Sequence, residues 1–211
     1  MSDTEANYYG AYLEPLKQCE AEILSTLEQL LQPLNENQDE TIVEHILSRI
    51  KSPESMQEKL RKKDLPTDAT TALTHTADTI GIRLVTHFVG DVYKIQEVLR
   101  NCQKWKVIKE KDYIAMPKEN GYRSLHIIIE IPFSAHSTLQ AIQAEIQLRT
   151  IAMDCWASLE HQMKYKKNIP NAALLISELK RCADEMASTD LTMQTIREQI
   201  LQKHETSLSR K

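Results

Sequence analysis

The segment "STLQAIQAEIQLRT" (137–150) alternates between apolar and polar residues, which is the pattern of a strand with one wet face. Its apolar positions are Ile142, Ala144, Ile146 and Leu148, and its polar positions are Gln143, Glu145, Gln147 and Arg149. The polar side spreads a carboxylate, an amide and a guanidinium over about 13 Å. It is either an ordinary solvated face or a cleft lining, in which Glu145 binds a metal or accepts a proton while Gln147 and Arg149 bind polar or anionic groups.

Asp78 is a second carboxylate of interest, because it stands just before the β-branched run Ile80–Phe88. One interpretation is an ordinary turn or cap residue. The other is that Asp78 and Glu145 converge on Mg²⁺, which commonly takes one or two protein carboxylates together with substrate phosphates. Spacing alone does not decide between the two interpretations.

The segment Ser48–Lys63 holds six cations and only two anions. The cations of interest are Arg49, Lys51, Lys59 and Lys62. They form either a solvated helix face or a site for a small polyanion, with lysines as point charges and Arg as a planar fork or stacking plate. Ser55, near the expected start of a helix, would add a donor where backbone N–H groups already favour anions.

The stretch "KENGYRSLH" (118–126) places an aromatic ring beside a glycine and two cations. Tyr122 is either a half-buried core ring or a platform for a nucleobase, whose stacking is worth on the order of 1–3 kcal/mol. Gly121, Lys118 and Arg123 favour the platform. His126 alternates onto the face away from Arg123, and a single histidine on a strand is more often structural than catalytic.

The elements that must position these residues are predicted from periodicity and cap signals. Helices are expected at 14–32, at 42–50 with Asp39 or Thr41 as its cap, from Ser52-Pro53 onward, at 68–75, 91–101, 151–166 and 171–204. "PLNENQ" (33–38) is expected to be a linker. Strands are expected at 80–88, 105–114, 123–131 and 137–150, with the third central in the sheet because its middle is apolar on both faces. We therefore expect an N-terminal helix and linker (1–38), an α/β core (39–170) and a C-terminal helix (171–211).

Composition narrows the class of protein. The chain has 211 residues, and its net charge of −4 argues against a general nucleic-acid coat. No apolar run is long enough to span a bilayer, and the acidic N-terminus does not read as a signal peptide. Four scattered cysteines without a CxxC pair indicate reduced thiols in a cytoplasmic protein. The GxxxxGK[ST] and GxGxxG phosphate-binding motifs and any His-Asp dipeptide are absent from the sequence.

Four stretches in register resemble the synthetase domain of RelA/SpoT-type (p)ppGpp synthetases. They are "SRIKSPESMQEKLRKK", "ADTIGIRLV", "KEKDYIAMPKENGYRSLH" and "AEIQLRTIAMDCWASLEHQMKYK", and together they span about 42–166. The length resembles that of the small alarmone synthetases. The resemblance implies an α/β (α+β) fold with a mixed sheet, flanking helices and a nucleotidyltransferase-like core. It also implies transfer of pyrophosphate from ATP to the 3′-hydroxyl of GDP or GTP with release of AMP, dependent on Mg²⁺ and without hydrolase activity.

The resemblance also implies roles for individual residues. Arg49 and Arg83 would sandwich adenine. The ATP phosphates would bind Lys51, Ser55, Lys59 and Lys62. Asp78 and Glu145 would ligate Mg²⁺, with Glu145 also helping to deprotonate the 3′-hydroxyl. Tyr122 would stack on guanine, and the rest of the acceptor would be held by Lys118, His126, Gln147 and Arg149, with Asp154 near the acceptor base.

Two departures from the family pattern leave the choice between GDP and GTP open. Lys109 stands where some long relatives have Arg, and Asp154 stands where some small synthetases have Asn. The family resemblance further implies a homotetramer packed through the terminal helices. From the net charge and the lack of long apolar runs we expect no stable nucleic-acid partner and no membrane association. The alternatives are a toxic relative that pyrophosphorylates the 3′ end of tRNA and a catalytically silent nucleotide- or RNA-binding regulator.

Overall fold

The computed structural model describes residues 3–35, 41–136, 139–164 and 172–208. Before the sheet the chain forms α1 (Asp3–Tyr9), the 3-10 turn η1 (Gly10–Tyr12) and α2 (Leu13–Asn35). The central part comprises β1 (Val43–Ile50), α3 (Pro53–Arg61), α4 (Ala69–His75), β2 (Ile80–Thr86), α5 (Val89–Arg100) and β3 (Lys106–Asp112). The chain continues with β4 (Leu125–His136), β5 (Leu139–Thr150), α6 (Ile151–Lys164) and α7 (Ala172–Leu208).

The five strands form one mixed sheet in the order β1-β2-β5-β4-β3. The β2–β5 pair is parallel, whereas β1–β2, β5–β4 and β4–β3 are antiparallel. β5 lies in the middle of the sheet. β4 is interior, as its apolar centre predicts, but it sits one place away from the middle. The mixed α/β class expected from the sequence is confirmed.

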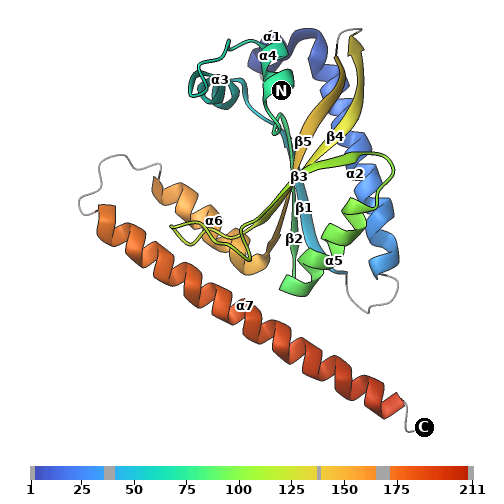
Figure 1. The fold of residues 1–211 in the computed structure, drawn as a ribbon, viewed down its shortest axis with the longest axis vertical. Coiled ribbons are helices and arrows are strands. Elements are labelled where there is room, and N and C mark those ends of the chain that lie inside the picture. The colour runs from blue at the N-terminus through green and yellow to red at the C-terminus, as the bar shows by residue number, and fades with distance from the viewer. Residues whose placement is uncertain (1–2, 36–40, 137–138, 165–171, 209–211) are drawn as a thin grey trace.

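Helices cover the two faces of the sheet differently, as Figure 1 shows with the sheet seen nearly edge-on. α2 and α5 cover one face and bury the main hydrophobic core, which includes Ile82, Ile142 and Ile146. α6 and α7 lie on the other side, and α3 and α4 stand near one end of the sheet. Because strand side chains alternate, the polar positions of β5 point away from the core. The part of this second face that α6 and α7 leave uncovered is open for chemistry (Figure 1).

The segment expected to be a helix at 42–50 is instead the edge strand β1, so this prediction was wrong. The apolar positions Val43, Ile46 and Ile50 fit a helical spacing, but the segment is β-branched and pairs with β2 across its length. A register shift between Val43 and His45 breaks the strict alternation that would have revealed a strand. Thr41 precedes this strand and caps no helix, while Asp39 lies outside the described residues.

Most other predicted elements are confirmed within a few residues. α3 begins after Ser52, whose side chain accepts a hydrogen bond from the Ser55 N–H, and Pro53 occupies its first turn. Asp68 caps α4 by accepting from the Thr71 N–H. The expected linker at 33–38 was wrong in part, because α2 runs through Pro33 to Asn35, and residues 36–38 lie outside the described residues.

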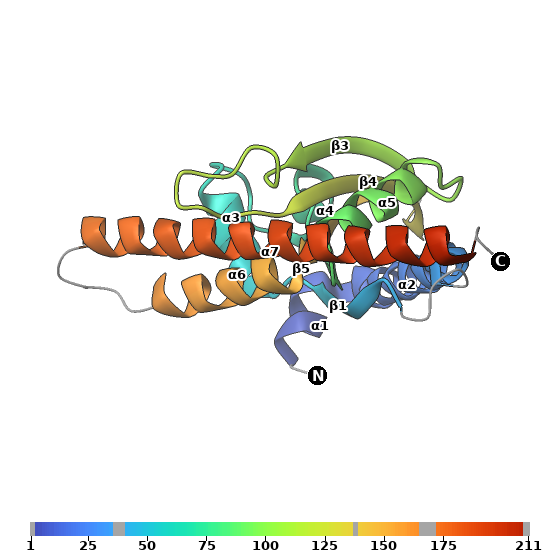
Figure 2. The same cartoon turned by 90° about the horizontal axis from the view of Figure 1, so that it is seen from below.

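α7 is a single 37-residue helix that runs beside α6 and past the edge of the core (Figure 2). It exposes many large apolar side chains, which are Leu174, Leu175, Ile176, Leu191, Met193, Ile196, Ile200 and Leu201. Searching the described residues finds no helix with the length and apolar character needed to cross a membrane.

Candidate active site

The polar face of the sheet forms the floor of an open cleft of about 490 Å³, a size typical of small-molecule sites. Its lining residues come from β1, β2, β5 and the segments next to them: Leu47, Ser48, Arg49, Lys51, Asp78, Gly81, Ile82, Arg83, Glu145 and Gln147. Strand register brings these positions together. Gly81 pairs with Glu145 and Arg83 with Gln147 across the parallel pair, while Arg49 pairs with Gly81 from β1.

Asp78 stands just before β2 and bonds to two lysines at once. The Lys59 ammonium donates to its Oδ1 and the Lys51 ammonium to its Oδ2, each at 2.6 Å. Burial by itself would raise the pKa of the Asp78 carboxyl, but the hydrogen bonds and charges of the two lysines outweigh it and lower the pKa. Asp78 is therefore ionised at neutral pH, with cations beside it that can also bind phosphates.

Lys51 is held in place from behind by the N-terminal helix. The Tyr9 hydroxyl donates to the Lys51 carbonyl oxygen at 2.6 Å, and the Lys51 N–H donates to the carbonyl of Thr79 at 2.8 Å. The Tyr9 side chain is 1 % exposed, whereas the neighbouring Tyr8 hydroxyl is buried without a hydrogen-bond partner among the described residues. Sequence reasoning assigned nothing to these tyrosines, since no pattern links residue 9 to residue 51.

Glu145 projects from β5 and accepts two hydrogen bonds. His126 Nδ1 lies 3.0 Å from its Oε1, and Gln147 Nε2 donates to its Oε2 at 2.8 Å. Burial again opposes ionisation, but the hydrogen bond and charge of His126, followed by Gln147, lower the pKa of the Glu145 carboxyl. The charge of Asp78 raises that same pKa, so the two carboxylates are close enough to interact. Asp78 and Glu145 therefore line one cleft, while their joint binding of Mg²⁺ stays a prediction.

An aromatic cluster continues the site beyond Glu145. The Tyr122 hydroxyl lies 2.8 Å from His126 Nε2 and accepts a bond of 2.6 Å from Arg149. The Lys118 ammonium sits 4.7 Å from the centres of both the Tyr122 and Tyr113 rings, which are arranged edge to face. Sequence reasoning missed Tyr113, although its place just before the Lys118 loop could have suggested it.

Asp154, in the first turn of α6, links the two halves of the site. Arg83 lies 3.1 Å from its Oδ1, and Arg149 donates to the same oxygen at 3.0 Å. Arg149 is 4 % exposed and also donates to the buried Ser124 hydroxyl at 3.3 Å. Arg83 also has a buried Nε with no hydrogen-bond partner among the described residues.

Three residues that the sequence analysis singled out, Lys62, Ser55 and Arg123, are not among the residues that line the cleft. Lys62 is largely exposed and pairs with Glu58 at 2.7 Å, away from the residues that line the cleft. Ser55 lies in the first turn of α3 and bonds to Ser52. Arg123, grouped with Lys118 as a cation beside the aromatic platform, instead turns to α7. That grouping was wrong because Ala183 and Asp184 of α7 hold the Arg123 guanidinium, whereas the Lys118 ammonium does lie over the Tyr122 ring.

The site presents cations on two sides of its carboxylates, an arrangement that suits anionic ligands. Lys51 and Lys59 bind Asp78 on one side of the cleft, which Arg49 and Arg83 also line. On the other side, Tyr122 contacts His126, and Lys118 and Arg149 lie over the Tyr122 ring. Among the described residues, no group of three or more His, Cys, Asp or Glu side chains forms a metal cage. A divalent cation here would take its remaining ligands from substrate and water.

Comparisons with known proteins agree with this arrangement. The model of the "Region found in RelA / SpoT proteins" matches residues 48–170. The GTP pyrophosphokinase YwaC of Bacillus subtilis is 41 % identical over 158 residues, covering 75 % of each chain. The GTP pyrophosphokinase YjbM of the same organism is 32 % identical over 202 residues, covering 95 % of this chain and 93 % of its own.

Solved structures are similar over nearly the whole chain. The small alarmone synthetase 1 of Bacillus subtilis bound to its product pppGpp has a TM-score of 0.78 at 30 % identity, covering 90 % of this chain and 96 % of its own. The small alarmone synthetase 2 of that organism has a TM-score of 0.76 at 37 % identity, covering 88 % and 97 %. From the matched region and these relatives, the chain belongs to the RelA/SpoT family.

Proposed function

We propose that the protein transfers pyrophosphate from ATP to the 3′-hydroxyl of GDP or GTP, making ppGpp or pppGpp and releasing AMP. One observation carries the proposal. Asp78 and Glu145, both ionised, line one cleft between a lysine-rich side and an aromatic, arginine-containing side. A reaction between two nucleotides needs two such sides. The names of the relatives and the pppGpp in one similar structure support the same assignment.

The donor would occupy the side formed by β1, α3 and β2. Arg49 and Arg83 lie on neighbouring strands and line the same cleft. Their two planar guanidinium groups would stack on the two faces of adenine. Lys51 and Lys59 are the nearest ammonium groups for the phosphates. Since both already neutralise Asp78, donor binding would transfer them from a carboxylate to phosphate oxygens at little electrostatic cost. Ser55, in the first turn of α3, and Lys62, at its C-terminal cap, would reach the phosphates from opposite ends of that helix.

The acceptor would occupy the side formed by the Lys118–Ser124 loop, β4 and the end of β5. Guanine would stack on Tyr122, with Lys118 near its phosphates. His126, Gln147 and Arg149 would position the ribose and the phosphates, each already fixed by a hydrogen bond to a neighbour. Asp154 forms ion pairs with both Arg83 and Arg149, so it would connect an adenine-binding residue with an acceptor-binding residue.

The donor set of the cleft fits Mg²⁺. Asp78 and Glu145 offer hard oxygen ligands, are kept ionised, and interact through their charges. Bound there together with the triphosphate, Mg²⁺ would supply neutralisation of charge on the transferring group. Release of AMP with transfer of both outer phosphates requires attack of the 3′-oxygen at the β-phosphorus. The bond between the β-phosphorus and the α–β bridging oxygen breaks, and that oxygen leaves with AMP.

The chain's own residues would prepare that attack. The 3′-hydroxyl is a poor nucleophile at neutral pH, so a base must take its proton as the new bond forms. Glu145 has its two oxygens oriented by His126 and Gln147, which leaves it rigid and deprotonated. Lys51 and Lys59 would stabilise charge on the phosphates, and the sheet would hold attacking and leaving oxygens in line.

The test is a transfer assay with purified protein, Mg²⁺ and γ-labelled ATP. GDP, GTP, GMP, ADP and deacylated tRNA are offered separately, and the products are resolved. Label on GDP or GTP with release of AMP is the expected result and ranks the acceptors. Label on tRNA alone, or nucleotide binding without any transfer, would contradict the proposal.

We also propose that the protein assembles as a homotetramer. The exposed apolar side chains of α7 are of the kind that another copy of the chain would cover. Light scattering after size-exclusion chromatography is expected to give four times the chain mass. Replacing Leu191 and Ile196 on α7 by lysine is expected to lower that mass, whereas a monomer in the parent chain would contradict the proposal.

A further inference from the structure

The loop that carries Tyr122 is a tight turn with little freedom of its own. The Gly121 N–H donates to the carbonyl of Lys118 at 2.8 Å, and the Lys118 N–H donates to that of Tyr122 at 3.2 Å. Gly121 adopts φ +88°, a region that favours glycine. The loop therefore has one defined shape, and what surrounds it decides whether it keeps that shape.

α6 supports one side of this loop. The Asn120 amide donates to Glu160 at 3.0 Å, and its oxygen accepts from the Tyr122 N–H at 3.2 Å. The Trp156 ring lies 6.5 Å from that of Tyr122, edge to face. The Trp156 indole N–H in turn donates to the carbonyl of Leu179 on α7 at 2.9 Å. α6 is thus both a support for the loop and the link to the next helix.

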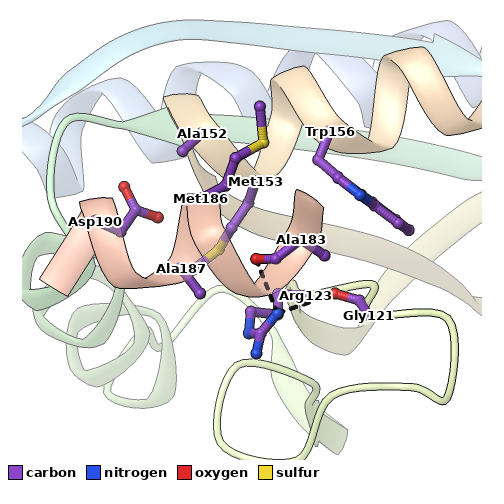
Figure 3. A pocket seen from close by; sticks show the side chains of 9 residues that line it. All are labelled: Gly121, Arg123, Ala152, Met153, Trp156, Ala183, Met186, Ala187 and Asp190. Carbon is purple, nitrogen blue, oxygen red and sulfur yellow. Dashed lines mark hydrogen bonds between the residues drawn. The ribbon is translucent and has the colours of Figure 1, made fainter. Parts of the chain in front are cut away.

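α7 contacts the loop directly, as the close-up in Figure 3 shows. Arg123 donates to the Ala183 carbonyl at 3.3 Å and to Asp184 Oδ1 at 3.1 Å, and also to the Gly121 carbonyl at 3.2 Å. A methyl group at Gly121 would sit 2.5 Å from the Ala183 Cβ, so the two backbones pack as closely as glycine permits. Only a cavity of about 10 Å³ remains between these elements.

The rest of α7 is tied to the body of the protein. Thr150, at the end of β5, donates to the buried Asp190 at 2.5 Å. Further along, Arg197 donates to the fully buried Asp91 on α5 at 2.7 Å. A helix held at these points cannot move away from the loop without breaking buried polar contacts. α7 also lies beyond the matched family region, which ends at residue 170.

We propose that α7 positions the acceptor site, with Asp184 and Ala183 acting through Arg123 and Gly121 to hold Tyr122 ready for guanine. The inference rests on the proposed function, because it takes Tyr122 as the platform for a guanosine nucleotide. A loop that is already ordered binds its ligand more tightly, since no ordering cost falls on the binding step. Asp184 and Ala183 are positioning residues that touch no substrate.

The test compares Asp184→Ala with the matched control Glu185→Ala. Glu185 is the next residue on α7 and pairs with Arg181 of the same helix, not with the loop. GDP and ATP binding are measured separately by calorimetry, and KM for each nucleotide and kcat are measured in the transfer assay. Asp184→Ala is expected to weaken GDP binding and raise the acceptor KM about 3- to 10-fold, with ATP binding and kcat unchanged. Glu185→Ala is expected to change none of these, and Asp184→Glu to restore most of the GDP affinity.

The outcomes separate the two ideas. If the parent chain binds neither GDP nor GTP, the proposed function fails and this inference falls with it. If the parent binds GDP and Asp184→Ala binds it equally well, the inference alone is overturned. Equal weakening of GDP and ATP binding would mean a general structural role for Asp184 and would also overturn it.

Discussion

Two adjacent tyrosines in α1 offer a sharp test of how the site is held from behind. Tyr9→Phe removes a hydroxyl that donates to the Lys51 carbonyl at 2.6 Å, while the buried ring can stay in place. The carbonyl then loses a partner in a half-buried position, which costs about 1–3 kcal/mol. For a chain of this size we expect the midpoint of thermal unfolding to fall by about 2–4 °C per kcal/mol.

Tyr8→Phe is the matched control, because it removes the same atom one residue away. The Tyr8 hydroxyl is buried without a hydrogen-bond partner among the described residues, and burial raises its pKa. Deleting a buried, unpartnered hydroxyl relieves a desolvation cost of about 1–3 kcal/mol or less. Tyr8→Phe is therefore expected to be as stable as the parent chain or more stable.

Urea and thermal unfolding of both variants measure the difference, and KM for ATP reports on Lys51. Tyr9→Phe is expected to be the less stable of the two and to raise the ATP KM a few-fold, with the acceptor KM unchanged. Equal stability of the two variants would show that the Tyr9–Lys51 bond contributes nothing, and the reasoning from this contact would then be wrong.

Three further predictions concern the cleft and its supports. Glu145→Gln is expected to reduce transfer by about 10²-fold or more while guanosine nucleotide binding stays largely intact, and unchanged turnover would rule out Glu145 as the base. Gly121→Ala is expected to raise the acceptor KM about 10-fold, because φ at this residue is +88° and the new methyl group would lie 2.5 Å from the Ala183 Cβ. Adding Ala183→Gly is expected to recover part of the lost acceptor affinity. No recovery in the double variant would contradict the packing argument. Burial raises the pKa of the Asp190 carboxyl above 3.8. The folded chain therefore binds the carboxyl proton more tightly than the unfolded chain does. As a result, the free energy of unfolding falls as pH rises from 3.8 through the pKa of the folded state. Asp190→Asn, which can still accept from Thr150, should therefore be more stable than the parent at pH 7 in urea titrations and lose that advantage toward pH 3.8; an advantage independent of pH would count against the titration of Asp190.

Elements that depend on neighbouring residues, through strand alternation or a helix cap, could be predicted from the sequence. The alternation of Gln143 to Arg149 identified the polar face of β5, and Ser52-Pro53 identified the start of α3. β1 was missed because its apolar spacing fits a helix and its strand character comes from pairing with β2, a partner distant in the chain. The same limit hid α1, whose role depends on Tyr9 reaching Lys51.

The site residues were identified by resemblance, but spacing could not show how they meet. Asp78 and Glu145 are neighbours only because β2 and β5 are parallel and in one register. The turn of Arg123 toward α7 and the bridge from Asp154 to Arg83 likewise depend on helices that no short motif places. Tertiary packing settles these contacts, and a single sequence carries no direct record of it.

The parallel pairing of β2 with β5 also governs when the protein can become active. Gly81 cannot pair with Glu145 until the chain has been synthesised through β5 and β5 has inserted between β2 and β4. Such non-local pairing forms slowly, because a long loop must close before any contact rewards it. A nascent or partly folded chain can contain Lys51 and Lys59 but not the assembled pair of carboxylates. Catalysis therefore requires the last strand to be in place, and no folding intermediate without β5 can consume ATP by this route.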